Sequence, residues 1–451
     1  MESGLPMPVK TIPKFRDMPG MERNADKRLI RLHFDKIYLE RNHNSMKSKL
    51  MAQAYLIAAL INILGNDSIL FMKFEPTFSP INLKGDPPTE GLNIIGVLKG
   101  PDYGTSEDKA MFIGAHYDTV PESPGIVDNG SGTIAVLELA RLLNNLSKKS
   151  KIPFTVYFIL FDLEEYGLLG SFSFVNSFVS DAVTKKTFGV LGAFTFDMIL
   201  TFNPRNNTQD WLQDQSFLIA CPVETKTRIN SGSRGNFISV WLRSDADEVV
   251  SNSISAAFRS NEIKLSICSN SFPKYVREFN DKEKMQMTVN DSIAKYTIPA
   301  VLMTDLGPYR VPISHCYHKK CDNLSFLTAE NLHFLTTVID TAFNAIEIII
   351  KDPPAPVELL RCNDCYFKKI EDRWHVLCRK HGRHKQRERI YDPRTKWIVT
   401  HVTRGGRPFQ KKPEAYILNL CPPGGFDYKK RFFWPNWDEI KKEWHPKLYK
   451  N

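Results

Sequence analysis

The sequence lacks a long uninterrupted apolar run. Its most apolar stretch, Tyr55 to Leu64, is about half of the ~20 residues that a membrane-spanning helix requires. The longer stretch Leu332 to Ile350 is interrupted by Asp340 and Glu347. The first twenty residues contain no basic segment followed by about 7–15 apolar residues, the pattern of a secretory signal. These absences predict a cytoplasmic chain without a membrane segment.

The features of disordered and repetitive chains are also absent. Hydrophobic residues make up 42% of the sequence and charged residues 24%, as in ordinary globular proteins. No internal repeat is present. The 451 residues exceed the ~250–300 at which a single hydrophobic core stops growing. We therefore expect one large domain with an appended part.

Positive charge is concentrated at one end of the chain. Residues 361–451 contain 23 Lys and Arg and 10 Asp and Glu, a balance of +13, whereas residues 1–360 contain 37 and 40, a balance of −3. Five of the seven tryptophans also lie in the last segment. We expect an N-terminal arm over residues 1–24, a main domain over 25–352 and a basic, aromatic-rich C-terminal region of unknown fold over 353–451.

Strand-like and helix-like patterns alternate along the main domain. This alternation predicts an α/β fold with a mixed, mostly parallel central sheet and helices on both faces, plus a small C-terminal appendage. Strands are expected at 68–74, 92–98, 111–115, 154–160, 190–196 and 299–304. Helical patterns cover 22–65, 131–146, 168–179 and 329–350. Residues 202–252 give no clear pattern.

Histidine and carboxylate side chains follow several of the expected strands. Open α/β sheets build their sites at the carboxyl ends of the strands, so these side chains are expected to lie close together. One of them, Asp128, opens a helix within the segment DNGSG, and two others are adjacent glutamates. The candidates are His116, Asp118, Asp128, Glu164, Glu165, Asp197 and His318.

The donor types in this set fit a pair of catalytic zinc ions. Imidazole nitrogens and carboxylate oxygens without thiolates are typical of zinc sites that keep open positions. Asp128 can bridge two metals, and Asp118 can orient the ring of His116 from behind. One of two adjacent glutamates can bind metal while the other holds a proton. Each motif alone has an ordinary structural explanation, and it is their ordered conjunction that predicts a site.

These motifs resemble the co-catalytic zinc aminopeptidases of the bacterial leucyl aminopeptidase type, relatives of glutamate carboxypeptidases and glutaminyl cyclases. The resemblance covers roughly residues 25–350 and rests on GAHYDTV (114–120), VDNGSGTIAVLELAR (127–141), FDLEEYGLLGS (161–171), FDM (196–198) and YHKKCDN (317–323). It implies a zinc exopeptidase fold, two zinc ions per chain, and peptide or protein N-termini as substrate. Members of this family are often secreted, which opposes the cytoplasmic prediction.

The resemblance also implies a role for each residue of the set. His116 and Asp197 would bind one zinc ion, Glu165 and His318 the other, and Asp128 would bridge both. Glu164 would act as general base, with Asp118 behind His116. Tyr309 is a candidate oxyanion donor, and a surface tyrosine is the alternative.

The sequence departs from the family pattern in two places. Lys319, Lys320 and Cys321 stand where members commonly have Thr-x-x after the last histidine, and Asn290-Asp291-Ser292 stands where they often have Ser-Asp-His. The alternatives on the same fold are glutaminyl cyclisation with one zinc ion, a glutamate-releasing carboxypeptidase, and an inactive binding module. The inactive module predicts missing ligands. All five ligand positions are intact, so hydrolysis of an N-terminal peptide bond is favoured.

Two cysteine patterns leave their chemistry open. We expect Cys316 and Cys321, on either side of His318, to be thiols, with a small disulfide loop as the alternative. In the C-terminal region, one set of residues has the spacing of a third zinc site, namely Cys362, Cys365, Cys378 and His381. The alternative is that these cysteines are unpaired or form disulfides.

The same C-terminal region combines a basic run at 379–389 with tryptophans at 374, 397, 434 and 437. This composition suits contact of residues 361–451 with a polyanion or a nucleic acid, and a solvated face on a folded cap is the alternative.

Overall fold

An eight-stranded sheet organises the part of the chain that the computed structural model describes. That part comprises residues 23–76, 88–179, 182, 187–211, 221–242, 247–268, 299–354, 365–370, 373–378 and 386–387. The strand order is β1-β2-β4-β3-β5-β8-β6-β7. The strands are β1 (Ile69–Phe74), β2 (Gly91–Leu98), β3 (Lys109–His116), β4 (Thr155–Phe161), β5 (Gly189–Phe196), β6 (Phe237–Trp241), β7 (Lys264–Cys268) and β8 (Ala300–Thr304).

The centre of the sheet is parallel and its flanks are mixed. Strand β3 pairs in parallel with β4 and β5, and β5 pairs in parallel with β8. Antiparallel pairs join β1 to β2, β2 to β4, and β6 to β8. The predicted α/β fold with a mixed, mostly parallel sheet is therefore confirmed.

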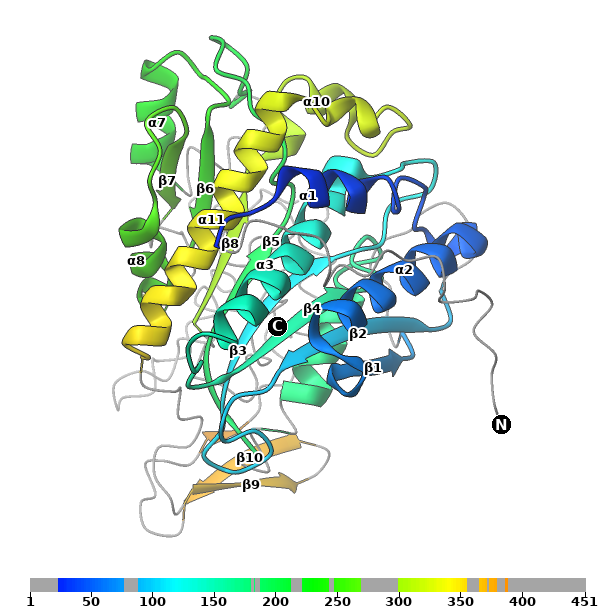
Figure 1. Cartoon of the computed structure of the whole chain (residues 1–451), viewed down its shortest axis with the longest axis vertical. Helices are drawn as coiled ribbons and strands as arrows, with labels where there is room; N and C mark the ends of the chain where they lie inside the picture. The colour runs from blue at the N-terminus through cyan, green and yellow to red at the C-terminus, as the bar shows by residue number, and fades with distance from the viewer. Residues whose placement is uncertain are drawn as a thin grey trace, which may run out of the picture. The chain divides into compact units, whose positions relative to one another are not determined.

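Helices cover both faces of this sheet. In β3, Met111 and Ile113 face the larger apolar core, while Ala110 and Phe112 face the smaller one on the opposite side. The larger core packs under the helices seen in front of the sheet in Figure 1, namely α1 (Lys27–Phe34), α2 (Met46–Leu64), α3 (Ser131–Ser147), α8 (Glu248–Ala257) and α11 (Ala329–Lys351). The smaller core packs under the π-helix Phe174–Val179, which continues directly from α4 (Leu169–Ser173).

Most strand and helix predictions agree with the structure to within a few residues, with one exception. The single helical region predicted over 22–65 is wrong, because α1 ends at Phe34 and α2 begins at Met46. The intervening segment is held by Arg41 and Asn42, which bond main-chain carbonyls of a distant loop. Within 202–252 the structure has α7 (Pro222–Asn230), β6 and the start of α8.

One described helix, α11, has the length and apolar composition of a membrane span. Its side chains, among them Phe334, Val338, Ile339 and Phe343, are buried in the larger core. A buried core helix can have the same length and apolar composition as a membrane span, and α11 has the burial of such a core helix.

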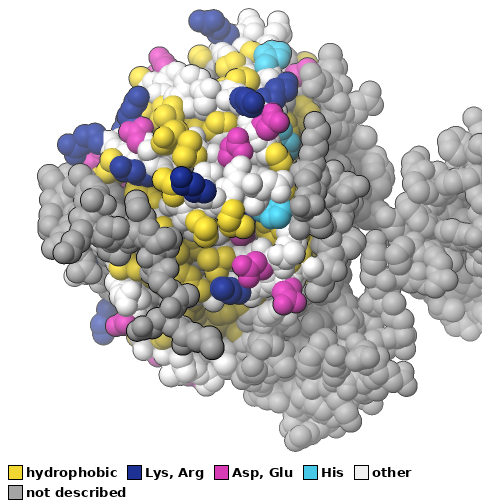
Figure 2. All heavy atoms as spheres, turned by 90° about the vertical axis from the view of Figure 1, so that its right-hand side faces the viewer, with side chains coloured by type: hydrophobic (Ala, Val, Ile, Leu, Met, Phe, Trp, Pro, Cys, Tyr) yellow, Lys and Arg dark blue, Asp and Glu magenta, His cyan; other side chains and the backbone are white. Residues whose placement is uncertain are grey.

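One face of the molecule is mixed in character. Figure 2 shows one face on which hydrophobic side chains alternate with Lys, Arg, Asp and Glu side chains. Exposed apolar side chains of the first described segment include Tyr38, Leu39, Met46, Leu50 and Met51.

The contacts divide the chain into two compact units, residues 1–367 with 376–385 and residues 368–375 with 386–451. A three-stranded sheet of order β11-β10-β9 is formed by Gln386–Arg387, Arg373–Cys378 and Cys365–Ile370. Several predictions lie outside the described residues: most of the N-terminal arm, Asn290-Asp291-Ser292, the ligands Cys362 and His381, and most of the basic run at 379–389. The side chains of Cys365 and Cys378 are likewise not described.

Candidate metal centre

Three adjacent parallel strands bring four of the candidate residues to one edge of the sheet. His116 is the last residue of β3, and Asp197 directly follows β5. Glu164 and Glu165 follow the end of β4. Because β4, β3 and β5 are neighbours with the same direction, their carboxyl ends deliver these side chains to a common place.

Two further residues reach this edge on loops. Asp128 lies in the turn Ile126–Gly130, which leads into α3. His318 follows the short helix α10 (Ile313–Cys316) and has a positive φ of 59°. The structure therefore brings together all the candidate residues, although they come from segments spread over about 200 residues of sequence.

The side chains form two groups that share Asp128. His116 Nε2 lies 3.5 Å from Asp128 Oδ1 and 3.5 Å from Asp197 Oδ1. His318 Nε2 lies 3.1 Å from Asp128 Oδ2 and 3.3 Å from Glu165 Oε2. Each oxygen of Asp128 thus belongs to a different group. Glu164 Oε2 lies 3.8 Å from His116 Nε2, beside the first group.

The spacing of these atoms fits zinc. Ligand atoms bound tetrahedrally at roughly 2.0–2.2 Å from one ion are about 3.3–3.6 Å apart, close to the observed separations. Among the described residues, Glu165 Oε1 and Asp197 Oδ1 are buried and have no hydrogen-bond partner. Native proteins rarely leave buried polar atoms unsatisfied, so these oxygens fit the role of ligands.

The electrostatics of the cluster also favour a cation. Burial raises the pKa of the Glu164 carboxyl well above its usual range, and the charges of Glu165 and Asp197 raise it further. Burial alone would lower the pKa of His116, but the surrounding carboxylates, Glu164 foremost, outweigh burial and raise it. His318, although also partly desolvated, has its pKa raised to about 10 by hydrogen bonds to Asp128 and Glu165. Excess negative charge therefore gathers at this point.

Asp118 supports the cluster from behind. Its backbone oxygen lies 3.2 Å and its Oδ1 3.5 Å from His116 Nδ1, the ring nitrogen that faces away from the other ligands. Its two carboxylate oxygens also accept hydrogen bonds from the backbone N–H groups of Glu164 and Glu165. Asp118 thus contacts both the histidine and the glutamate pair.

Two buried residues outside the proposed ligand set hold the loops around the site. Asp322 accepts hydrogen bonds from the backbone N–H groups of Val127 and Asp128 at 2.8 and 3.1 Å. The guanidinium of Arg41 donates to main-chain carbonyls on both sides of the site, those of Ile37, Leu39, Tyr117, Pro124 and Gly125. Asp322 belongs to the YHKKCDN motif. Its hydrogen bonds, like those of Arg41, go to distant main-chain partners that no local pattern reveals.

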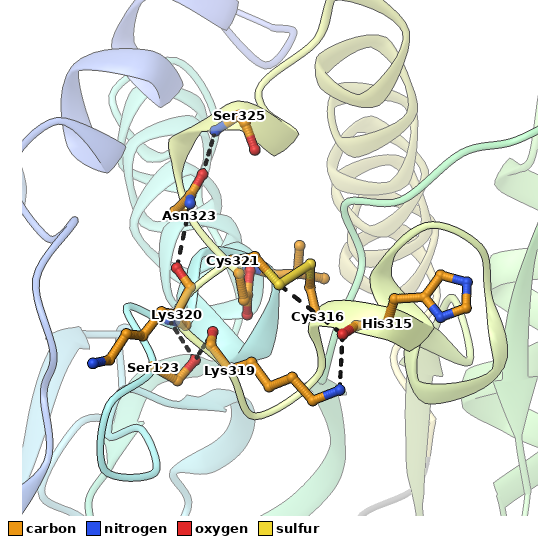
Figure 3. Close-up of a disulfide and its surroundings, with 11 residues drawn as sticks. Ser123, His315, Cys316, Lys319, Lys320, Cys321, Asn323 and Ser325 are labelled. Carbon is orange, nitrogen blue, oxygen red and sulfur yellow. Dashed lines mark hydrogen bonds between the residues drawn. A yellow bond between two sulfur atoms is a disulfide. The ribbon is translucent and has the colours of Figure 1, made fainter.

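The expectation that Cys316 and Cys321 are thiols is wrong, because the two residues form a disulfide around His318 (Figure 3). A second disulfide joins Cys221 to Cys268. Close approach of the Cα atoms, 5.1 and 5.5 Å apart, permits both bridges.

The lysines that depart from the family pattern lie on the surface of the same loop. Figure 3 shows Lys319 directed toward His315, whose backbone oxygen it contacts, and Lys320 directed away from it. The Nζ atom of Lys320 lies 3.7 Å from exposed Glu122. Tyr309 is half-buried beside an apolar cluster that contains Trp211 and Phe237.

The fold and these residues define an α/β protein with a cluster of potential metal ligands at the carboxyl ends of its parallel strands. The profile of peptidase family M28 matches residues 93–342, more than half of the chain. The chain belongs to this family.

Individual relatives match only in part. A probable lipoprotein aminopeptidase of Mycobacterium tuberculosis is 38% identical over 131 residues, which cover 29% of this chain and 25% of that protein. The aminopeptidase YwaD of Bacillus subtilis is 44% identical over 84 residues, 19% of this chain and 17% of that protein. The crystal structure of the LapA aminopeptidase of Legionella pneumophila aligns with a TM-score of 0.44 at 18% identity, over 71% of each chain. The matched segments thus span a quarter or less of the length of these two relatives.

Proposed function

We propose that this chain is a zinc-dependent aminopeptidase with two zinc ions, one held by His116, Asp128 and Asp197 and the other by Asp128, Glu165 and His318. The observation that carries the proposal is the division of the two Asp128 oxygens between His116 and His318. Residues 25–352 would form the catalytic domain, and peptide or protein N-termini would be its substrates. The names of the relatives, both aminopeptidases, point the same way.

Zinc, when bound, supplies a Lewis acid that polarises the scissile carbonyl and makes a neighbouring water acidic enough to lose its proton near neutral pH. Glu164 lies beside the first ligand group without belonging to either proposed ligand set, so its carboxylate is free to take that proton. The deprotonated water would then form a bond to the scissile carbonyl carbon. As the C–N bond breaks, the same carboxyl would return the proton to the leaving amine.

The disulfides bear on where such an enzyme would work. Structural disulfides persist in oxidising compartments and are rare in the cytosol. We therefore propose a secreted or cell-envelope location in place of the cytoplasmic one expected from the sequence. Mass spectrometry of protein alkylated directly from cells tests this location: bridged cysteines agree with it, and alkylated thiols at all four positions oppose it.

The test of the proposed function measures zinc content by mass spectrometry, together with hydrolysis of a panel of aminoacyl-anilides. We expect about two zinc ions per chain, and activity that a chelator abolishes. Glu164→Gln should keep both ions and lose activity at least about 100-fold, because it removes the base and spares the ligands. The control Glu122→Gln changes an exposed glutamate nearby and should retain activity.

Three results would contradict the proposal. One zinc ion without anilide hydrolysis would indicate cyclisation of N-terminal glutamine, and hydrolysis only at the carboxyl end of peptides would indicate a carboxypeptidase. Purified protein that binds no zinc would indicate an inactive binding module.

A further inference from the structure

Asn129, the residue after the shared ligand, joins two ligand-bearing segments. Its Nδ2 donates to the backbone oxygen of Phe196 at 2.8 Å, and its Oδ1 accepts the backbone N–H of Met198 at 3.2 Å. These two contacts lie on either side of Asp197. The side chain of Asn129 is completely buried, so its hydrogen bonds do not compete with solvent.

The contacts of the Asp197 side chain do little to fix its orientation. About 38% of that side chain is exposed, more than for His116 or Asp128, and its Oδ1 has no hydrogen-bond partner among the described residues. Its direction therefore depends on the backbone. Met198, the next residue, has a positive φ of 47°, a conformation that a non-glycine residue adopts only when its surroundings impose it.

The rest of the DNGSG segment repeats the same connection. Ser131 Oγ accepts the backbone N–H of Ile199 at 3.0 Å and donates to the backbone oxygen of Val127. Gly132 donates its N–H to Asn129 Oδ1. A Cβ atom at Gly132 would lie 2.5 Å from Asn129 Oδ1 and 2.7 Å from the Phe196 oxygen, so glycine is required for this close approach. The segment thus fixes the start of α3 against the end of β5.

We propose that Asn129 is a positioning residue that sets Asp197 relative to Asp128, and thereby controls how tightly the group His116, Asp128 and Asp197 holds its metal. The inference rests on the proposed function. Residues that orient metal ligands typically change metal affinity about 10–100-fold when mutated. The effect is expected at one ion of the pair, because Glu165 and His318 make no contact with the Asn129 side chain in the described structure.

The test is a competition titration with a chromophoric chelator, which resolves the release of each zinc ion, on the full chain and two variants. Asn129→Ala removes all three contacts and should weaken one ion about 10–100-fold while the other is retained. Asn129→Asp keeps the acceptor for Met198 and Gly132 and loses the donor to Phe196, so it should fall between wild type and Asn129→Ala. Loss of activity should track occupancy of the weakened ion and appear mainly in kcat.

A matched control is Asn331→Ala. Asn331 is also a buried asparagine that bridges two main-chain groups, the Phe202 N–H and the Phe326 oxygen, but it contacts none of the candidate ligands. It should lower thermal stability and leave both zinc affinities unchanged. Equal zinc affinities in wild type and Asn129→Ala would overturn the inference and leave the proposed function standing.

Two other outcomes also reject the inference. Parallel loss of both ions in Asn129→Ala, with the same loss of stability as Asn331→Ala, would assign Asn129 a general structural role. A wild-type protein that holds no zinc would reject the proposed function, and the inference would fall with it.

Discussion

His33 is a buried histidine whose charge state links folding to pH. Its Nδ1 lies 2.7 Å from the hydroxyl oxygen of Tyr55, and burial, reinforced by the nearby charge of Arg141, lowers its pKa to about 4. In the unfolded chain His33 becomes protonated below about pH 6.5, whereas in the folded chain it becomes protonated only below about pH 4. Stability should therefore fall as the pH is lowered from 6.5 to 4, by roughly 3 kcal/mol from this residue.

The variant His33→Gln measures this contribution directly. Glutamine retains hydrogen-bonding capacity and does not titrate, so the variant should lose about 3 kcal/mol less than wild type over the same pH range. Urea unfolding at pH 7, 5.5 and 4 gives the pH dependence of the unfolding free energy for each of the two proteins. Identical pH dependence of the two proteins would show that His33 is not the source.

At the residue scale, the chemical types at the site could be predicted and the supporting contacts could not. His116, Asp128 and His318 stand out because metal chemistry limits the residue types and because they follow strand ends in order. Arg41 and Asn129 bond almost entirely to main-chain atoms. Such bonds depend on the fold and leave no trace in the spacing of residues.

At the scale of elements, strands with a clear apolar run were predictable and the conformations of the ligand loops were not. The central strands β3 and β4 are buried on both faces and give recognisable apolar runs. The loops contain non-glycine residues at positive φ, namely Leu163, Met198 and His318, where sequence favours glycine. Tertiary hydrogen bonds, such as those of Asp118 to Glu164 and Glu165, offset this cost of roughly 1–3 kcal/mol per residue.

The disulfide loop Cys316 to Cys321 should act on the site more than on overall stability. It closes six residues that include His318, and its Lys319 oxygen accepts a hydrogen bond from Ser123 (Figure 3). Replacing both cysteines by serine frees the loop that carries one proposed ligand. Chain entropy for so short a loop predicts a loss of only about 2 kcal/mol in unfolding free energy. Zinc affinity of the His318 group should fall about tenfold, as measured by chelator competition.

The second disulfide provides the contrasting control. Cys221 and Cys268 are 47 residues apart and both are buried in an apolar cluster away from the ligands. Their replacement by serine should cost more stability, roughly 4 kcal/mol, and leave both zinc affinities unchanged in the folded protein. A larger loss of zinc affinity in the Cys221/Cys268 variant than in the Cys316/Cys321 variant would contradict a positioning role for the loop.

At the scale of the whole molecule, the order of strand-like and helix-like patterns predicted the α/β class, whereas composition gave no fold for the C-terminal region. The mostly parallel sheet follows from alternating patterns along residues 68–350, because long regular elements dominate there. Beyond residue 354, charge and tryptophan content distinguish a region without specifying contacts. Its proposed association with polyanions rests on electrostatics, which acts at long range and needs no particular fold.

Removal of residues 356–451 should therefore separate two properties of the chain. Helix α11 ends at Lys351, so the truncation leaves every described element of the eight-stranded sheet and its helices intact. Heparin binding at low salt should be lost, because residues 361–451 carry a balance of +13 and residues 1–360 one of −3. Anilide hydrolysis and the melting temperature should be retained. Heparin binding by the full chain should weaken steeply with added salt. A truncated protein that unfolds would assign the C-terminal region to a structural cap. A truncated protein that still binds heparin would contradict the proposed association of residues 361–451 with polyanions.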